Sequence, residues 1–339
     1  MSSDGRRAGD VRRVPAGPAS VAAGIFVLLS AAAGLLLGDV AIPWREVVAA
    51  LTDVSSTDQN AMIVRDLRLP RVLVGLLAGA ALAASGAALQ SLTGNPLADP
   101  YLAGVASGAS VGVGAAVLLG IGGGAALPLM AFAGSAAATV LVFAASRRRS
   151  KLDLDAFLLS GVVLGTFLAA VMQLLLSLAG QDQSRILGWL MGYLGDSNPT
   201  QVLWLAATVI PGVLVLAASG KALDAFCFGE DTARSIGVRV EWFKMSRLGV
   251  IALLTAVAVA STGIVGFVGL VIPHLVRSLT GPPNRTLIPF CAAGGAVLLC
   301  AADTLGRSLL PDRPLPVGVV TALIGAPVMV MLLRRTAER

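Results

Sequence analysis

Residues 221–247 read KALDAFCFGEDTARSIGVRVEWFKMSR and lie between two long apolar runs. The stretch holds nine charged residues in 27, and each would cost about 2.5–3.5 kcal/mol at the centre of a bilayer. We therefore expect it to be a loop outside the membrane. Glu230 and Asp231 favour a helix start, Ala233 follows at helical spacing, and Gly237 is placed to end the helix. The sequence predicts a short amphipathic helix within this loop.

The composition on either side of this loop is that of an integral membrane protein. Hydrophobic residues make up 56% of the chain and charged residues 13%, whereas soluble domains carry about 25% charged residues; the mean hydropathy is +0.85. The net charge of +6 is divided among loops, so membrane topology explains it better than nucleic-acid binding. The three cysteines have no disulfide or metal spacing and are expected to pack as small apolar residues: Cys227, Cys291 and Cys300.

The apolar runs predict an all-α polytopic protein with about ten spans. Residues 1–18 are expected to form a disordered basic tail, and residues 19–335 a single transmembrane domain that includes the loop 221–247. The first apolar run is longer than the roughly 7–15 residues of a signal-peptide core, so a retained span is expected. The spans are expected near 19–38, 70–92, 101–119, 125–145, 154–179, 202–219, 248–262, 267–279, 287–310 and 315–333. The eighth is interrupted by Pro273, so a short or broken helix is expected there.

The distribution of Lys and Arg predicts the orientation of these spans. With both termini in the cytoplasm, 18 of the 25 Lys and Arg residues lie in cytoplasmic segments and 7 lie outside, as the positive-inside rule requires. Spans two and seven then run in opposite directions and share similar sequences at 84–86 and 260–263. We therefore expect an inverted repeat of spans two to five against spans seven to ten.

Four separated strings resemble the iron-siderophore and cobalamin (FecCD-type) permease family of ABC importers. The first string begins at Arg68 and contains NPLADP at 95–100. The second lies at 229–237 in the polar loop, and the other two are GFVGLVIPH at 266–274 and LPVGVVTALIGAP at 315–327. The resemblance covers about residues 60–335, and the strings occur in the family's order.

The resemblance implies three functional sites. The first is a coupling helix that docks on a cytoplasmic ATPase subunit, with an ordinary solvated loop helix as the alternative; its residues are Gly229, Glu230, Ala233, Arg234 and Gly237. The second is a turn at the cytoplasmic gate, carried by Asn95 and Leu97.

The third implied site faces the opposite side of the membrane. There the family presents arginines to acidic residues of a substrate-binding protein, at positions that match Arg68, Arg71 and Arg307. The alternative is that these arginines anchor spans at the interface. Asp303 is the one acidic residue away from the ends of a predicted span, and Arg307 follows one turn later, so a local ion pair near the outer end is expected.

No catalytic constellation is present in the sequence. His274 is the only histidine, so a histidine metal cluster or a Ser-His-Asp triad lacks parts. Gly220-Lys221 is followed by Ala222 and does not form a nucleotide-binding loop. We therefore expect a non-catalytic subunit without a cofactor of its own, with ATP and Mg²⁺ bound by a partner.

Together these features predict the permease subunit of an importer in the bacterial cell membrane. The family works as a dimer of permeases over two ATPase subunits and receives its cargo from an extracytoplasmic binding protein. A ferric siderophore is the expected cargo, with cobalamin and haem left open, as is the choice between homodimer and heterodimer. An ion-coupled secondary transporter is the alternative from another class, but it would need more acidic residues at mid-depth. A membrane scaffold or sensor has no positive support in the sequence.

Overall fold

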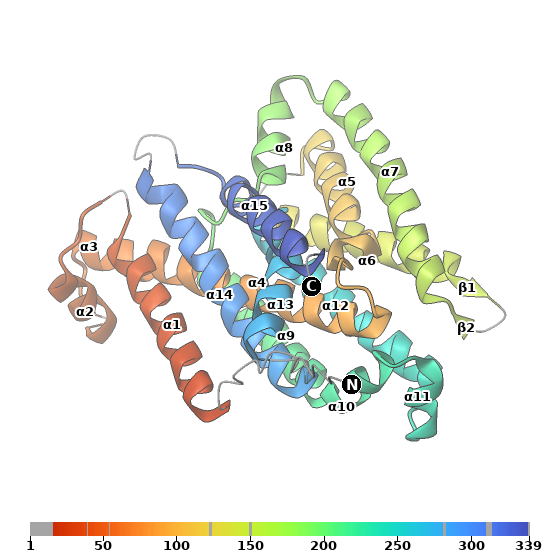
Figure 1. The fold of residues 1–339 in the computed structure, drawn as a ribbon. Coiled ribbons are helices and arrows are strands. Elements are labelled where there is room, and N and C mark those ends of the chain that lie inside the picture. The colour runs from red at the N-terminus through yellow and green to blue at the C-terminus, as the bar shows by residue number, and fades with distance from the viewer. Residues whose placement is uncertain are drawn as a thin grey trace.

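The computed structural model describes residues 16–38, 40–53, 55–121, 124–148, 151–280, 283–309 and 314–337. Helices form nearly all the regular structure of this part of the chain (Figure 1). A hairpin pairs β1 (Arg147–Arg148) with β2 (Lys151–Leu152). Most of the predicted basic tail lies outside the described residues, and residues 16–18 form the first turn of α1.

Seven helical stretches are long and apolar enough to cross a membrane. They are α1 (Ala16–Leu36), the continuous stretch of α3 (Gln59–Met62), η1 (Ile63–Arg68) and α4 (Leu69–Thr93), then α6 (Ala126–Ala145), α7 (Leu154–Leu178), α9 (Pro199–Ala218), α12 (Val240–Thr262) and α14 (Asn284–Leu309). Three helices with shorter apolar parts complete the set: α5 (Val105–Leu118), α13 (Val268–Thr280) and α15 (Val317–Ala337). Each predicted span coincides with one of these helices, while a count of ten membrane crossings stays a prediction.

The connection predicted between the first two spans is itself folded. It contains α2 (Trp44–Thr52), α3 and the π-helical turn η1. These elements share a small apolar core separate from the main one, made of Ile42, Val47, Ala50, Ala61 and Val64. The remaining short helices are η2 (Pro100–Ala103), η3 (Gly180–Asp182), α8 (Gln183–Leu190), α10 (Gly220–Phe226) and α11 (Glu230–Ser235).

The sequence predicted that the polar stretch 221–247 is a loop with one short helix, and the structure differs from this prediction. The stretch contains α10 and α11, and residues 240–247 are the first two turns of the long helix α12. Charged side chains are stabilised in these two turns of α12. Lys244 is paired with carboxylates, and the guanidinium of Arg247 lies 5.1 Å from the centre of the Phe243 ring. The predicted short helix is confirmed as α11, and Gly237 follows it with φ 85°.

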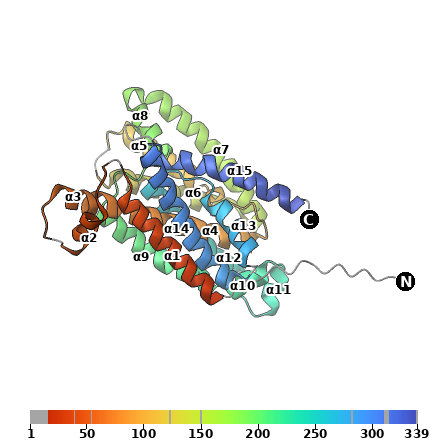
Figure 2. The same cartoon turned by 60° about the vertical axis from the view of Figure 1, so that its left-hand side comes forward.

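Helix α4 lies at the centre of the helical bundle (Figures 1 and 2). In the most apolar 18-residue part of the stretch Gln59–Thr93, which includes α4, 78% of the residues are buried. The corresponding shares are 11% in α7 and 17% in α1. The close packing of α4 on α14 depends on glycine, because a Cβ at Gly79 would lie 2.2 Å from the carbonyl oxygen of Gly295, and the reverse distance is the same. Such small residues allow helix backbones to approach where lipid and side chain are equally apolar.

The two halves of the chain exchange packing partners. Helix α4 packs on α13 and α14, and α12 packs on α5 and α6. Within each half, α5 contacts α6 as α13 contacts α14, and α6 contacts α7 as α14 contacts α15. An inverted repeat of α4–α7 against α12–α15 would produce this exchange. Helices α2 and α3 lie at one end of the molecule and α10 and α11 at the other (Figures 1 and 2).

Candidate coupling surface, gate and docking site

Helix α11 is flanked by two glycines and contains one buried alanine. Gly229 begins it with φ 103° and ψ 160°, a backbone conformation that favours glycine, and Gly237 follows it with φ 85°. Ala233 is fully buried, whereas Arg234 and Asp231 pair with each other on the solvent side. The predicted coupling residues therefore form one compact unit with one face anchored and one face free for a partner.

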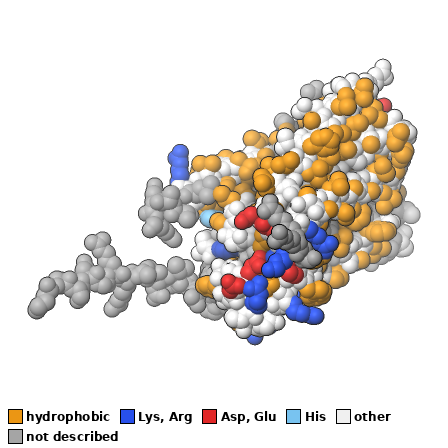
Figure 3. Space-filling view, turned by 90° about the vertical axis from the view of Figure 1, so that its right-hand side faces the viewer, with side chains coloured by type: hydrophobic (Ala, Val, Ile, Leu, Met, Phe, Trp, Pro, Cys, Tyr) orange, Lys and Arg blue, Asp and Glu red, His pale blue; other side chains and the backbone are white. Residues whose placement is uncertain are grey.

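Two exposed apolar side chains flank this helix. Phe228 is 80% exposed and Ile236 is 59% exposed. Figure 3 shows Lys, Arg, Asp and Glu side chains gathered at this end of the molecule, beside a large apolar surface. Exposed apolar groups rimmed by charges are typical of a protein–protein or membrane interaction site.

Lys244 connects α11 to α12 and to the β1–β2 hairpin. Its side chain is 2% exposed, and its Nζ lies 2.8 Å from Oε1 of Glu230 and 3.0 Å from Oε1 of Glu241. The same Nζ donates to the carbonyl oxygen of Leu152 at 2.6 Å, and Glu241 Oε2 accepts the N–H of Leu152 at 2.7 Å. One lysine thus joins α11, α12 and the hairpin. Sequence reasoning did not assign Lys244, although its place three residues after Glu241 was a signal for a helical ion pair.

An open cavity of about 510 Å³ lies beside Lys244. The hairpin, the start of α7, the start of α11 and the last turn of α4 all contribute to its wall; from α4 come Leu92 and Thr93. The end of α4 and the start of α11 therefore line the same cavity at this end of the molecule.

The predicted gate residues follow this end of α4 directly. Gly94 ends the helix with φ 62°, and the side-chain oxygen of Asn95 accepts the N–H of Leu97 at 2.9 Å. This side-chain turn orients Leu97, whose side chain is 49% exposed, while the next residue, Ala98, is fully buried. The structure thus places Asn95 and Leu97 at the same end as α11, and their role in a gate stays a prediction.

Cys227 lies between α10 and α11 and is exposed, whereas the sequence predicted that all three cysteines are packed. Cys291 and Cys300 are buried as expected. The Cys227 Sγ donates to the carbonyl oxygen of Ser91 at 3.6 Å, and partial burial of the thiol raises the pKa of Cys227.

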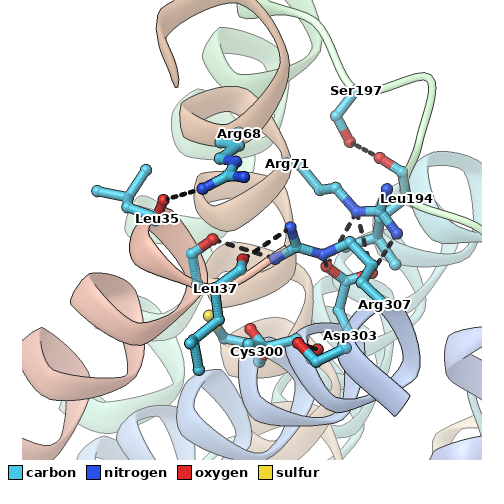
Figure 4. Close-up of polar contacts among 12 residues, drawn as sticks. Leu35, Leu37, Arg68, Arg71, Leu194, Ser197, Cys300, Asp303 and Arg307 are labelled. Carbon is cyan, nitrogen blue, oxygen red and sulfur yellow. Dashed lines mark hydrogen bonds and ion pairs between the residues drawn. The ribbon is translucent and has the colours of Figure 1, made fainter. Parts of the chain in front are cut away.

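The predicted docking arginines lie at the opposite end, around a single carboxylate (Figure 4). Arg71 binds Asp303 with two nitrogens, at 2.9 Å from Nε to Oδ2 and 2.7 Å from Nη2 to Oδ1. Arg307 Nε lies 3.1 Å from Oδ2 of the same residue, which confirms the predicted local ion pair. Asp303 therefore pairs with two guanidinium groups.

Two of these arginines also bind the C-terminal end of α1. Arg68 donates to the carbonyl oxygens of Leu35 at 2.7 Å and Leu36 at 3.2 Å, and to that of Val40. Arg307 donates to the carbonyl oxygens of Gly34 at 3.1 Å and Leu37 at 3.2 Å.

These bonds bury the three arginines, and docking of a substrate-binding protein on them stays a prediction. Arg68 is 5% exposed, Arg307 is 4% exposed and the Arg71 side chain is 16% exposed. The physical reason is that the last carbonyls of a helix lack helical partners, and Arg68 and Arg307 supply them.

The model of the FecCD transport family matches residues 25–335. The chain belongs to the FecCD transport family. It is a multi-pass membrane protein of the ABC importer permease type.

Several members are similar over most of their length. An uncharacterized ABC transporter permease protein, YvrB of Bacillus subtilis, is 40% identical over 80% of this chain and 79% of its own. The cobalamin import system permease BtuC of Halobacterium salinarum is 38% identical over 86% and 80%. The vitamin B12 import system permease BtuC of Salmonella newport is 41% identical over 83% and 86%.

Two solved structures share the fold. A metal-chelate type ABC transporter in an inward-facing conformation superposes with a TM-score of 0.83 at 28% identity, over 94% of this chain and 99% of that one. PsaBC from Streptococcus pneumoniae in complex with Fab gives a TM-score of 0.57 at 16% identity, over 85% and 94%, and supports the fold alone.

Proposed function

We propose that this chain is the permease of an importer that moves a large metal chelate across the bacterial cell membrane, driven by ATP hydrolysis on a partner subunit. The observation that carries the proposal is the α11 surface: Ala233 anchors it, Phe228 and Ile236 stand exposed, and Lys244 links it to α12 and the β1–β2 hairpin. A short helix with an anchored face and an open apolar face suits docking into a groove of another protein.

In the working assembly, two permeases, identical or related, stand over two ATPase subunits. Each ATPase subunit receives α11 of one permease, and its closure on ATP moves this helix and the Asn95–Leu97 turn that forms the gate. ATP and Mg²⁺ are held by the ATPase subunits, and the permease itself contributes no catalytic group.

At the other end, an extracytoplasmic binding protein docks near the arginine cluster. Arg71 is the most accessible of the three arginines and keeps a side-chain exposure of 16%. Arg68 and Arg307 hold α1 in place, and they reach an acidic partner only by exchanging their carbonyl acceptors for it.

The cargo we propose first is a ferric siderophore. Cobalamin is the second candidate, since two of the relatives named above are cobalamin or vitamin B12 permeases; haem is a third member of the same chemical class. All three are bulky chelates that a wide pathway between two permeases accommodates without metal ligands from the protein.

Uptake of labelled chelates tests the cargo. Cells with and without this chain are given a panel of ferric siderophores, haem and cobalamin. Loss of one compound in the deleted strain identifies the cargo. Retention of all of them, together with failure of the chain to co-purify with an ATPase subunit, would overturn the proposal.

The coupling surface is tested by a matched pair of substitutions. Phe228→Ala removes an 80% exposed ring beside α11, and Phe26→Ala removes a 62% exposed ring on α1. We expect Phe228→Ala to weaken ATPase binding by about tenfold or more, as loss of an interface anchor does, with Phe26→Ala close to wild type. Equal behaviour of the two variants would contradict a partner surface at α11.

A further inference from the structure

We propose that a buried chain of hydrogen bonds from Arg277 to Asp224 transmits the movement of the coupling helix to the gate. This chain, called here the polar chain, consists of Arg277, Ser91, Asn284 and Asp224. The inference rests on the proposed function, because it concerns how an ATPase subunit bound at α11 would act on the permease.

The polar chain joins four helices through three bonds. Arg277 Nη2 of α13 donates to Ser91 Oγ of α4 at 3.2 Å, and Ser91 Oγ donates to Asn284 Oδ1 of α14 at 2.6 Å. Asn284 Nδ2 then donates to Asp224 Oδ1 of α10 at 2.7 Å. A guanidinium can only donate and a carboxylate can only accept. The single hydroxyl hydrogen of Ser91 has two acceptors in reach, Asn284 Oδ1 and the Ala87 carbonyl oxygen at 2.9 Å, and with the hydrogen on Asn284 every bond points from the cation to the anion.

The middle of the polar chain is closed to solvent. Ser91 is 2% exposed and Asn284 is 1% exposed. A buried polar group that loses its partner finds no water to replace it, so breaking one bond is unfavourable. Movement of α10 therefore favours joint movement of its partners over separation from them.

Further contacts hold α10 on the start of α14 and α13 on the end of α4. Asp224 Oδ1 also accepts the backbone N–H of Asn284 at 2.8 Å, at the first residue of α14. A Cβ at Gly220 would lie 2.5 Å from the backbone nitrogen of Arg285, so α10 packs directly on the start of α14. Arg277 Nη1 donates to Gln90 Oε1 at 3.0 Å, which adds a second bond between α13 and α4.

The two ends of this connection are the coupling helix and the gate. Asp224 lies on α10, which leads through Gly229 into α11, and Ser91 lies in the last turn of α4, which leads into Asn95 and Leu97. Apolar contacts between helices permit sliding, whereas these bonds have fixed directions and keep the four helix ends in one register. The polar chain is therefore a set of positioning residues for the transport cycle.

The experiment measures gate movement without any cargo. Leu97→Cys is placed in a Cys227→Ser background, and the labelling rate of the new thiol by a maleimide is compared in the nucleotide-free and the vanadate-trapped ATPase complex. The same samples report ATPase-subunit affinity and ATP hydrolysis. If the proposed function holds, trapping changes the labelling rate by about fivefold or more.

Ser91→Ala breaks the polar chain, and Ser135→Ala is the matched control. Ser135 is also fully buried, and it donates to the backbone oxygen of Val105 on α5 at 2.9 Å. It lies on α6 and does not belong to the polar chain. We expect Ser91→Ala to reduce the labelling response to less than about twofold while ATPase affinity stays within about twofold of wild type. Ser135→Ala should respond as wild type.

A charge exchange tests the same connection while keeping a polar side chain at both positions. Asn284→Asp alone sets two carboxylates against each other and should abolish the response. Adding Asp224→Asn restores a single anion and a donor–acceptor pair between the two side chains, and should restore the response. This pair also decides the question if Ser91→Ala accumulates poorly.

The outcomes separate the two hypotheses. Equal responses of Ser91→Ala and Ser135→Ala, or no rescue of Asn284→Asp by Asp224→Asn, would overturn the polar chain while the permease assignment stands. A wild-type chain that binds no ATPase subunit, or whose gate does not respond to trapping, would overturn the proposed function and this inference with it.

Discussion

The ammonium group of Lys244 lies 2.8 Å from the carboxylate of Glu230, so the first residue of α11 is bonded to the inside of the molecule. The lysine side chain is 2% exposed, whereas that of Glu230 is 40% exposed. A change at Glu230 therefore has two effects: it alters a surface charge that a partner can meet, and it changes the environment of a buried cation.

Lys244→Met should destabilise this end of the molecule and weaken coupling. The substitution leaves Glu230 and Glu241 without their shared cation and frees the carbonyl of Leu152. We expect a loss of about 1.5–3 kcal/mol in the free energy of unfolding, the range for hydrogen bonds to charged groups. Thermal unfolding in detergent and ATPase co-purification measure it. Lys221→Met, at an exposed position on α10, is the control, and equal losses in both variants would contradict the role of Lys244.

Substitutions at Glu230 should separate its two roles. Glu230→Gln keeps an acceptor for Lys244 and should cost less than about 1 kcal/mol at this partly exposed position. Glu230→Lys places a second cation beside Lys244 and should reduce uptake by about tenfold or more through loss of ATPase docking. Uptake assays on both variants check this, and unchanged uptake with Glu230→Lys would count heavily against α11 as the coupling helix.

Asp303→Asn should be the most damaging single change at the arginine cluster. It leaves Arg71 and Arg307 without their carboxylate, and breaking a buried ion pair by removing one partner costs about 3–5 kcal/mol. Arg71→Gln should cost less stability, because Arg307 still pairs with Asp303, and should chiefly weaken binding of the substrate-binding protein. Unfolding temperature and binding-protein affinity, measured on both variants, distinguish these effects; a stable Asp303→Asn variant would contradict the structural role.

Much of this arrangement was accessible from the sequence. Long apolar runs predicted the helices because a span needs about 20 apolar residues, and the spacing around Ala233 predicted α11. The ion pair of Asp303 with Arg307 was predicted because both lie on one helix. The bond from Arg71 to Asp303 was not, since 232 residues separate them and only the packing of α4 on α14 brings them together.

The burial of the arginines escaped prediction for a related reason. Arg68 and Arg307 bind carbonyl groups at the end of α1, and backbone acceptors leave no mark in a sequence. Lys244 likewise was counted as one more charge of a polar loop, because pattern alone does not reveal which carboxylates a side chain meets. The polar chain from Arg277 to Asp224 depends on four helix ends meeting at one point.

Gly79→Val should separate the two central helices. A Cβ at Gly79 would lie 2.2 Å from the carbonyl oxygen of Gly295, so backbone must move to admit a side chain. We expect destabilisation of about 1–3 kcal/mol or more, as overpacking of a core produces, seen as a lower unfolding temperature and poorer accumulation in the membrane. Gly24→Val on α1 is the matched control, since no atom lies within 4 Å of a Cβ there. Equal accumulation of the two variants would contradict the close packing of α4 on α14.

Labelling of Cys227 should report both pH and partner binding. Cys227 is exposed, whereas Cys291 and Cys300 are buried, so a maleimide should modify one thiol of the native chain, and Cys227→Ser should abolish the signal. Burial raises the pKa of the Cys227 thiol above its ordinary value. Because the thiolate reacts and the thiol does not, labelling at neutral pH should be slower than for a free cysteine and should rise about tenfold per pH unit as the solution becomes alkaline.

The same thiol lies between α10 and α11, at the surface that an ATPase subunit should cover. Saturating ATPase subunit should therefore reduce the labelling rate by about tenfold at any fixed pH, and the pH dependence should keep its slope because the free fraction reacts by the same chemistry. Equal rates with and without bound ATPase subunit would place the contact away from α11. A rate that does not rise with pH would contradict the thiolate as the reacting species at Cys227.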